Sequence, residues 1–174
     1  TPEIMKKLGM GYTSENRKEE ALCLNLSIAD NLCLASIYDI SSKGTTNLKK
    51  ENEYIYRQID ALSIKVTDAK ARADSMSGGN QQKIVIGNWL NTSPNILLMD
   101  EPSRGIDVNA KQQIFNIIWD EAKRGVSTIM VSSELEELLE TCNRILIMSD
   151  GKITGEAVPE DLSVEALYSM CMED

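Results

Sequence analysis

The sequence contains no histidine among its 174 residues. This absence excludes serine–histidine and cysteine–histidine catalysis, histidine metal ligands, and the side chain that most often titrates near neutral pH. No apolar run approaches the roughly 20 residues that a membrane-spanning helix needs. The opening segment TPEIMKKLGM also has no signal-peptide core. We therefore expect a soluble chain that works without histidine.

Cysteine and basic charge are also scarce. The four cysteines, Cys23, Cys33, Cys142 and Cys171, are scattered and form no C-x-x-C pair, which indicates reduced thiols in a cytosolic protein. The chain carries 18 basic and 27 acidic side chains, and its net charge of −9 argues against a surface that binds nucleic-acid phosphates.

The second half of the chain alternates apolar runs with helical patterns. NILLM (95–99) and VSTIMVSS (126–133) are continuous apolar runs, typical of strands buried on both faces of a parallel sheet. Between them we expect a helix that Asp107 caps and that ends near Gly125. RILIMSDGKITGE (144–156) predicts a strand, a D-G turn and a second strand. The pattern predicts an α/β fold with a mostly parallel sheet flanked by helices.

The first half is predicted to be mainly helical. PEIMKKLG (2–9) predicts a short helix, and MGYTS (10–14) an extended segment. Ser27 is the expected cap of a helix over IADNLCLASIY (28–38). SSKGTTN (41–47) predicts a loop, and the spacing of apolar residues predicts a helix over 48–62.

Two adjacent glycines, Gly78 and Gly79, stand where the next helix begins, in SMSGGNQQK (75–83). A glycine costs a helix about 1 kcal/mol relative to alanine, so the pair needs a reason. With Ser77 as cap, bare N–H groups and the positive end of the helix dipole would face outward, and both favour an anion. The alternative is a plain glycine-rich turn capped by Ser77.

Asp100 and Glu101 follow the NILLM strand at its carboxyl end, where open α/β sheets place ligand chemistry. The arrangement resembles a Walker B element, in which the aspartate holds Mg²⁺ and the glutamate polarises an attacking water. The alternative is that both carboxylates only begin a solvated loop.

Three segments together resemble the ATP-binding cassette (ABC) ATPases. MSGGNQQK (76–83) is similar to the signature motif, LLMDEPSRGIDVNAK (97–111) to Walker B with the D-loop, and VSSELEELLETCNRILIMSDGKI (131–153) to the switch region. GYTSENRK (11–18) and EPSRGIDVNAK are similar to the C-terminal cassette of tandem-cassette ATPases that energise bacterial uptake of pentoses, hexoses and related small molecules.

The resemblance implies a P-loop NTPase-like α/β fold with three regions. About 1–26 would be the Q-loop part of the core, 27–90 an inserted α-helical signature subdomain, and 91–174 the part of the core with Walker B, D-loop and switch. The N-terminal part of such a domain would be missing, because the chain lacks G-x-x-x-x-G-K-[ST], the loop that cradles nucleotide phosphates. We therefore expect the chain alone to bind and hydrolyse ATP poorly.

The resemblance also implies which residues bind nucleotide. Paired cassettes sandwich ATP head to tail, so four signature residues would touch the γ-phosphate of a nucleotide held by a second cassette. These are Ser77, Gly78, Gly79 and Gln81.

For catalysis, the resemblance implies that Asp100 serves Mg²⁺, that Glu101 is the general base and that Asp107 is the D-loop aspartate. Two positions depart from the usual cassette pattern. Ser133 stands where most cassettes have a switch histidine, and its hydroxyl brings no charge and less reach. Glu15 stands at the Q-loop position, usually glutamine, where it could bind Mg²⁺.

The implied cofactors are ATP and Mg²⁺. The implied partners are a second nucleotide-binding domain in the same polypeptide, transmembrane permease subunits and, indirectly, a periplasmic or extracellular sugar-binding protein, with no nucleic acid. Such a chain would lie in the cytoplasm, held by the permease on the inner face of the membrane. Two alternatives stay open: an ABC-type ATPase of DNA repair or chromosome maintenance, and a catalytically inert interaction module.

Overall fold

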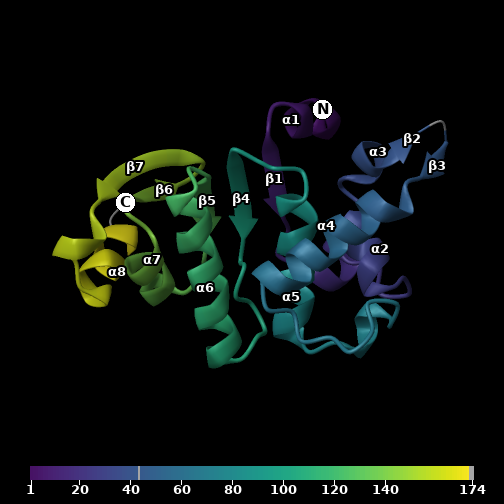
Figure 1. The fold of residues 1–174 in the computed structure, drawn as a ribbon. Helices are drawn as coiled ribbons and strands as arrows, with labels where there is room; N and C mark the ends of the chain where they lie inside the picture. Colours follow the sequence, from purple (N-terminus) through teal and green to yellow (C-terminus); the bar gives the residue numbers. More distant parts are fainter. Residues whose placement is uncertain (43, 173–174) are drawn as a thin grey trace. The chain divides into compact units, whose positions relative to one another are not determined.

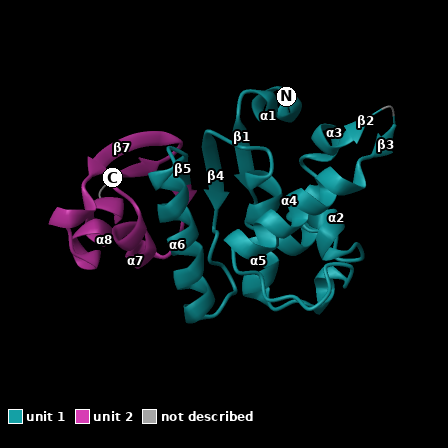
Figure 2. Cartoon of the chain, in the orientation of Figure 1, with its two compact units in different colours: residues 1–129 teal, residues 130–174 magenta. Residues whose placement is uncertain are grey.

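The computed structural model describes residues 1–42 and 44–172 (Figure 1). It contains two compact units, Thr1–Ile129 and Met130–Asp174, which Figure 2 shows in different colours. Within the described residues, no helix combines the length and the apolar character needed to cross a membrane.

Unit 1 is built around a parallel sheet and a group of helices. Its elements, in chain order, are α1 (Pro2–Lys7), β1 (Met10–Thr13), η1 (Arg17–Ala21), α2 (Ile28–Cys33), α3 (Ile37–Ile40), β2 (Ser41–Ser42), β3 (Thr45–Thr46), α4 (Leu48–Ala61), η2 (Ala73–Ser75), α5 (Gly78–Leu90), β4 (Ile96–Asp100), α6 (Val108–Lys123) and β5 (Ser127–Val131), which continues into unit 2.

The sheet has the order β1-β4-β5. β1 and β4 run parallel, with Met10 opposite Ile96 and Thr13 opposite Met99. The two strands therefore end together, and the segments that follow them start at the same edge of the sheet. The parallel pair and the flanking helices confirm the predicted α/β class.

Helix α5 is the central helix of unit 1. Ten of its 13 residues are buried, including the apolar run of Ile84, Val85 and Ile86. Helices α2 and α4 and strand β1 all pack against it (Figure 1). A helix covered on all sides is held by its neighbours, so its poor intrinsic start at Gly78 and Gly79 is tolerated.

The predicted helices α1, α4 and α6 are confirmed, as is the cap of α2. Ser27 Oγ accepts from the backbone N–H of Asp30, and the Asp30 carboxylate accepts in return from the N–H of Ser27. The predicted helix over 28–38 is too long, since α2 ends at Cys33 and α3 is separate. The predicted loop over 41–47 contains the antiparallel pair β2–β3, and Lys43 within it lies outside the described residues.

The prediction that both apolar strands are buried on two faces is wrong. In β4, Leu97 and Met99 are buried, whereas Ile96 and Leu98 on the other face are only half-buried. In β5, Ile129 and Val131 are 58% and 57% exposed. A continuous apolar run shows only that both faces of the strand are apolar enough to be buried. Whether each face is covered depends on which other elements pack against the sheet.

Unit 2 is an antiparallel hairpin covered by helices on one face. Its elements are α7 (Leu135–Thr141), β6 (Ile145–Ser149), β7 (Lys152–Ala157), η3 (Pro159–Asp161) and α8 (Val164–Met172). The predicted D-G turn is confirmed, because Asp150 and Gly151 both have positive φ, 48° and 75°. Ile145 and Ile147 pack with Leu167 of α8 in a small core.

Candidate functional site

The start of α5 presents unpaired backbone donors. Ser77 occupies the cap position with extended backbone, as predicted, but its Oγ accepts from the side chain of Asn80 at 3.1 Å and caps no backbone N–H. The first helical bond runs from the N–H of Gln81 to the carbonyl of Ser77 at 2.9 Å. Among the hydrogen bonds of the described residues, the N–H groups of Gly78, Gly79 and Asn80 have no acceptor. These three donors fit an anion.

The two glycines also allow close packing within the chain. A Cβ built on Gly79 would lie 2.4 Å from the Cβ of Ala110 in the first turn of α6. A Cβ on Gly78 would lie 2.9 Å from Arg17 Nη2 and 3.2 Å from the carbonyl oxygen of Gly105. All three distances are shorter than an ordinary contact of a Cβ atom, so no larger residue fits at either position without movement of its neighbours. The glycine pair therefore brings α5, α6 and the loop between β4 and α6 together.

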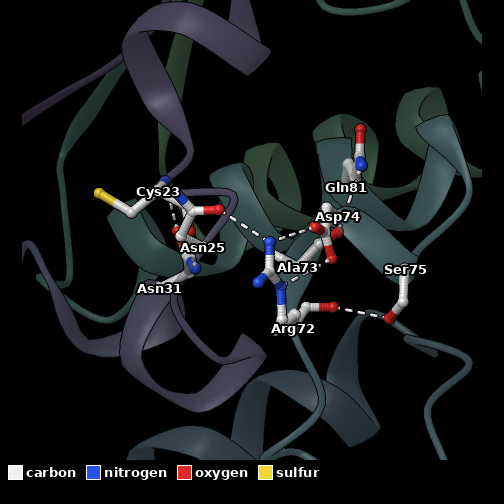
Figure 3. A network of polar contacts seen from close by, with 8 residues as sticks. All are labelled: Cys23, Asn25, Asn31, Arg72, Ala73, Asp74, Ser75 and Gln81. Atoms are coloured by element: carbon white, nitrogen blue, oxygen red, sulfur yellow. Dashed lines mark hydrogen bonds and ion pairs between the residues drawn. The ribbon is translucent and has the colours of Figure 1, made fainter.

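Gln81 lies apart from this surface. Its side chain is buried, and its Nε2 donates to the carbonyl of Ala73 at 3.2 Å (Figure 3). In the same network Arg72 Nη2 donates to Asn25 Oδ1 at 2.7 Å and to the Asp74 carboxylate at 2.5 Å. Figure 3 thus shows Gln81 anchored to residues inside unit 1. Its predicted contact with phosphate stays a prediction, and the observed contact is structural.

Asp100 ends β4 as predicted, and Tyr12 from the neighbouring strand contacts it. The Tyr12 hydroxyl hydrogen-bonds the Asp100 carboxylate. Burial, together with the negative charges of Asp100 and Glu20, raises the pKa of Tyr12. The phenol therefore stays protonated and donates to the carboxylate. No periodic pattern in the sequence predicts this pair, because the contact depends on the register of β1 against β4.

Glu101 follows with a left-handed backbone, φ 47°. A non-glycine residue in this region costs on the order of 1 kcal/mol, and such strain is concentrated at functional sites. The turn that it starts is closed by a hydrogen bond from the N–H of Arg104 to the carbonyl of Glu101 at 3.1 Å. The strained turn fixes where the chain leaves the sheet edge.

Asp107 ends that loop and caps α6. Its Oδ1 accepts from the backbone N–H of Ala110 at 3.0 Å, which confirms the predicted cap. Its role as the D-loop aspartate, which would signal across the interface between paired cassettes, stays a prediction.

The segment after β1 contacts the same loop. The Glu15 carboxylate forms an ion pair with the side chain of Arg104. Arg17 Nη1 donates to the carbonyl of Arg104 at 2.6 Å, and Nη2 donates to the carbonyl of Gly105 at 3.3 Å. Sequence reasoning did not identify Arg17 or Arg104, since the contacts join residues 87 and 88 positions apart.

Ser133, the predicted switch residue, belongs to unit 2 and is exposed. It lies in the segment between β5 and α7, so it follows a strand as predicted. Beside it, Ser132 Oγ donates to the carboxylate of the buried Glu137 at 2.9 Å.

A cavity of about 220 Å³ lies between the start of α5 and the start of α6. Its lining residues are Lys65, Ser77, Gly79, Asn80, Lys83, Asp107, Asn109, Ala110 and Gln113. Lys83 Nζ donates to the carbonyl of Ser63 at 3.0 Å, and burial, with the charge of Lys65, lowers its pKa. Lys65, Lys83 and the start of α5 line this cavity and favour an anionic ligand, while Asp107 contributes one carboxylate to the lining. A larger cavity, about 430 Å³, contains none of the predicted site residues.

No cluster of three or more acidic or cysteine side chains in residues 1–42 and 44–172 could hold a metal ion by itself. Mg²⁺ in nucleotide sites is commonly held by one or two carboxylates and by substrate phosphates. Asp100, a single carboxylate at the end of β4, meets that requirement. Glu15 fits it less well, because Arg104 already neutralises its carboxylate.

The fold is that of an ATP-binding cassette. The dimeric structure of the cassette MJ0796 bound to ADP and Pi matches with a TM-score of 0.74 and 19% identity, covering 91% of this chain and 67% of that one. The ADP conformation of the cassette MJ1267 matches with a TM-score of 0.74 and 18% identity, covering 99% and 72%.

The family profile for ABC transporters matches residues 5–104, and the chain belongs to this family. It is 40% identical over 169 residues to the ribose import ATP-binding protein RbsA of Bacillus subtilis (strain 168), covering 97% of this chain and 34% of that protein. It is 39% identical over 170 residues to ribose import ATP-binding protein RbsA 2 of Escherichia coli O157:H7, covering 98% and 34%. The chain spans about a third of the length of the curated relatives that it matches.

Proposed function

We propose that this chain is part of a nucleotide-binding cassette in the ATPase of an importer for ribose or a chemically similar small sugar. Membership of the ABC transporter family and the similarity to ribose import ATP-binding proteins support this assignment. The net charge of −9 disfavours the alternative in DNA repair or chromosome maintenance.

The observation that carries the proposal is the shared cavity at the starts of α5 and α6. The unpaired N–H groups of Gly78, Gly79 and Asn80 supply donors for phosphate oxygens, and Ser77 adds a hydroxyl. In the proposal, the γ-phosphate of ATP held by a second cassette occupies this position. Gln81, whose Nε2 bonds the carbonyl of Ala73 inside unit 1, is the fourth signature residue that we assign to this phosphate.

On the catalytic side, we assign Asp100 to Mg²⁺ and Glu101 to the attacking water. Asp100 would hold Mg²⁺, which would supply positive charge to neutralise the phosphates. Tyr12 keeps the Asp100 carboxylate in place, and the left-handed turn at Glu101 fixes its carboxylate beside the same sheet edge. Glu101 accepts a proton from the water that attacks the γ-phosphate.

Three further residues have proposed roles, and one of them, Ser133, belongs to unit 2. Asp107 holds the first turn of α6 and thereby one wall of the cavity, and it signals across the cassette interface. Ser133 donates its hydroxyl to the γ-phosphate. Glu15 reaches Mg²⁺ only after it leaves Arg104, so we assign it to a state other than the one observed.

For the organisation of the chain, we propose about 1–26 as the Q-loop part of the core, 27–90 as the helical signature subdomain and 91–174 as the Walker B, D-loop and switch part. The partners are a second cassette in the same polypeptide, permease subunits in the membrane and a sugar-binding protein that delivers the substrate. The complete ATPase would then lie on the cytoplasmic face of the membrane.

Uptake of labelled ribose by cells that express the complete polypeptide with its permease tests the proposal. Glu101→Gln should lower both uptake and ATP turnover by at least about a hundredfold, because the amide cannot accept the proton. Glu53→Gln, on the exposed side of α4, is the matched control and should change neither. Normal turnover in Glu101→Gln would overturn the general-base assignment, and salt-dependent retention on DNA without sugar uptake would overturn the importer.

A further inference from the structure

Three contacts join the segment after β1 to the loop between β4 and α6. The Glu15 carboxylate pairs with the side chain of Arg104. The Arg17 guanidinium donates to two successive backbone carbonyls of that loop, Arg104 at 2.6 Å and Gly105 at 3.3 Å. One side chain thus satisfies two acceptors in a loop that forms no regular structure of its own.

The guanidinium also lies against the first residue of α5. A Cβ on Gly78 would come within 2.9 Å of Arg17 Nη2, so the helix start is in close contact with this group. The Nε atom is buried, has no acceptor among the described residues, and its burial lowers the pKa of Arg17. A buried donor without an acceptor costs free energy. The two hydrogen bonds from Arg17 to the loop carbonyls offset that cost.

We propose that Arg17 is a positioning residue that fixes the backbone at Arg104 and Gly105 against the start of α5. This inference rests on the proposed function, because the loop and the helix start present the two sets of groups that face nucleotide. Arg17 does not line the cavity between α5 and α6, and it meets the helix start at Gly78 on the side where a Cβ would lie. It acts by holding Glu101 and Asp107, at the two ends of the loop, in register with Ser77 and Gly78.

A positioning role predicts a specific kinetic result. In the complete ATPase, Arg17→Met should lower kcat by roughly ten- to a hundredfold, since small displacements of catalytic groups have effects of this size. The KM for ATP should change by less than about twofold, because Arg17 makes no contact with the nucleotide. Arg17→Lys keeps the charge but offers a single ammonium instead of a two-pronged fork, so it should recover part of the loss.

The control is Arg72→Met. Arg72 also bridges two chain segments, through Asn25 and Asp74 (Figure 3), but within residues 1–42 and 44–172 none of its hydrogen bonds reaches the loop between β4 and α6. It should leave kcat and KM unchanged. Hydrogen exchange at the amides of Gly105 and Ile106 should become faster in Arg17→Met and Arg17→Lys and stay unchanged in Arg72→Met.

The outcomes separate the two proposals. If the unmodified ATPase does not couple ATP to sugar uptake, the proposed function fails. If it does, but Arg17→Lys matches the unmodified protein in kcat and in exchange at Gly105, the role of Arg17 is refuted. Arg17→Lys retains charge and most of the side-chain length, so it decides the question even if Arg17→Met does not fold. A rise in KM with unchanged kcat would also contradict the proposal.

Discussion

Replacing Gly79 by alanine tests whether the glycine is required for packing between α5 and α6. The new Cβ would lie 2.4 Å from the Cβ of Ala110 and 3.7 Å from its Cα. An ordinary carbon contact is about 3.5–4.0 Å, so the two helix starts must separate by roughly 1 Å or more. The neighbour is a short side chain on a helix backbone and cannot rotate away.

Two opposing effects set the magnitude. Overpacking a buried contact costs about 1–3 kcal/mol, and the severity of this overlap favours the upper half of that range. Alanine is favoured over glycine in a helix by up to about 1 kcal/mol. The free energy of unfolding of Gly79→Ala should therefore fall by about 1–2 kcal/mol.

Urea denaturation followed by tryptophan fluorescence measures this change. Both tryptophans, Trp89 and Trp119, lie in unit 1, so the signal reports the unit that contains the contact. The matched second variant is Ala110→Gly, which removes the opposing Cβ and leaves the 3.7 Å contact. The double variant should be more stable than the sum of the two single changes predicts, by about 1 kcal/mol or more.

A more stable Gly79→Ala variant would contradict the packing argument, because the gain in helix propensity would then exceed any cost of overlap with Ala110. Additive effects in the double variant would refute it as well, since they would show that the two residues do not interact. Either result would remove the packing reason for the glycine and leave only the anion-binding one.

Three further predictions concern unit 1 and the chain alone. Burial, with smaller effects of two carboxylates, raises the pKa of the Cys33 thiol from 9.0 to about 11. The unfolded chain therefore loses this proton at lower pH than the folded chain, and the free energy of unfolding falls as the pH rises from 9 to 11. Urea titrations at pH 8 and pH 11 should show that Cys33→Ala removes roughly 2 kcal/mol of this decrease. The buried Asn31 side chain accepts a hydrogen bond from the N–H of Cys23 at 2.8 Å and donates one to the carbonyl of Cys23 at 3.0 Å (Figure 3). Asn31→Ala should therefore lower the free energy of unfolding by about 2–4 kcal/mol, whereas the exposed control Asn52→Ala should leave it almost unchanged. Equal losses of stability in the two variants would contradict the burial argument. Calorimetric titration of MgATP into the 174-residue chain should show no micromolar binding, since the sequence lacks the phosphate-cradling loop; a micromolar Kd would contradict this.

Helix caps and tight turns could be predicted from the sequence. Asp107 caps α6, Ser27 caps α2, and the D-G pair turns between β6 and β7, because each involves groups within a few residues. Ser77 shows the limit of such rules. It occupies the cap position, but the side chain of Asn80 bonds its hydroxyl, and the helix N–H groups stay unpaired.

Features that depend on distant residues could not be read from the sequence. The exposure of Ile129 in β5 depends on which elements cover each face of the sheet. The contacts of Arg17 with Arg104 and Gly105 cross more than 80 positions and follow no periodic pattern. The motifs identified Glu101 as a site residue, but only the backbone shows the strained turn that holds it.

Hydrogen exchange of the complete polypeptide, with and without MgATP, tests directly whether the free N–H groups at the start of α5 bind phosphate. The Glu101→Gln variant is suited to this measurement, because bound ATP should persist. Saturating MgATP should slow exchange at residues 77–80, where the free N–H groups become bonded to phosphate, and at residues 100–107. Unchanged exchange at residues 77–80 while ATP saturates the protein would contradict this prediction.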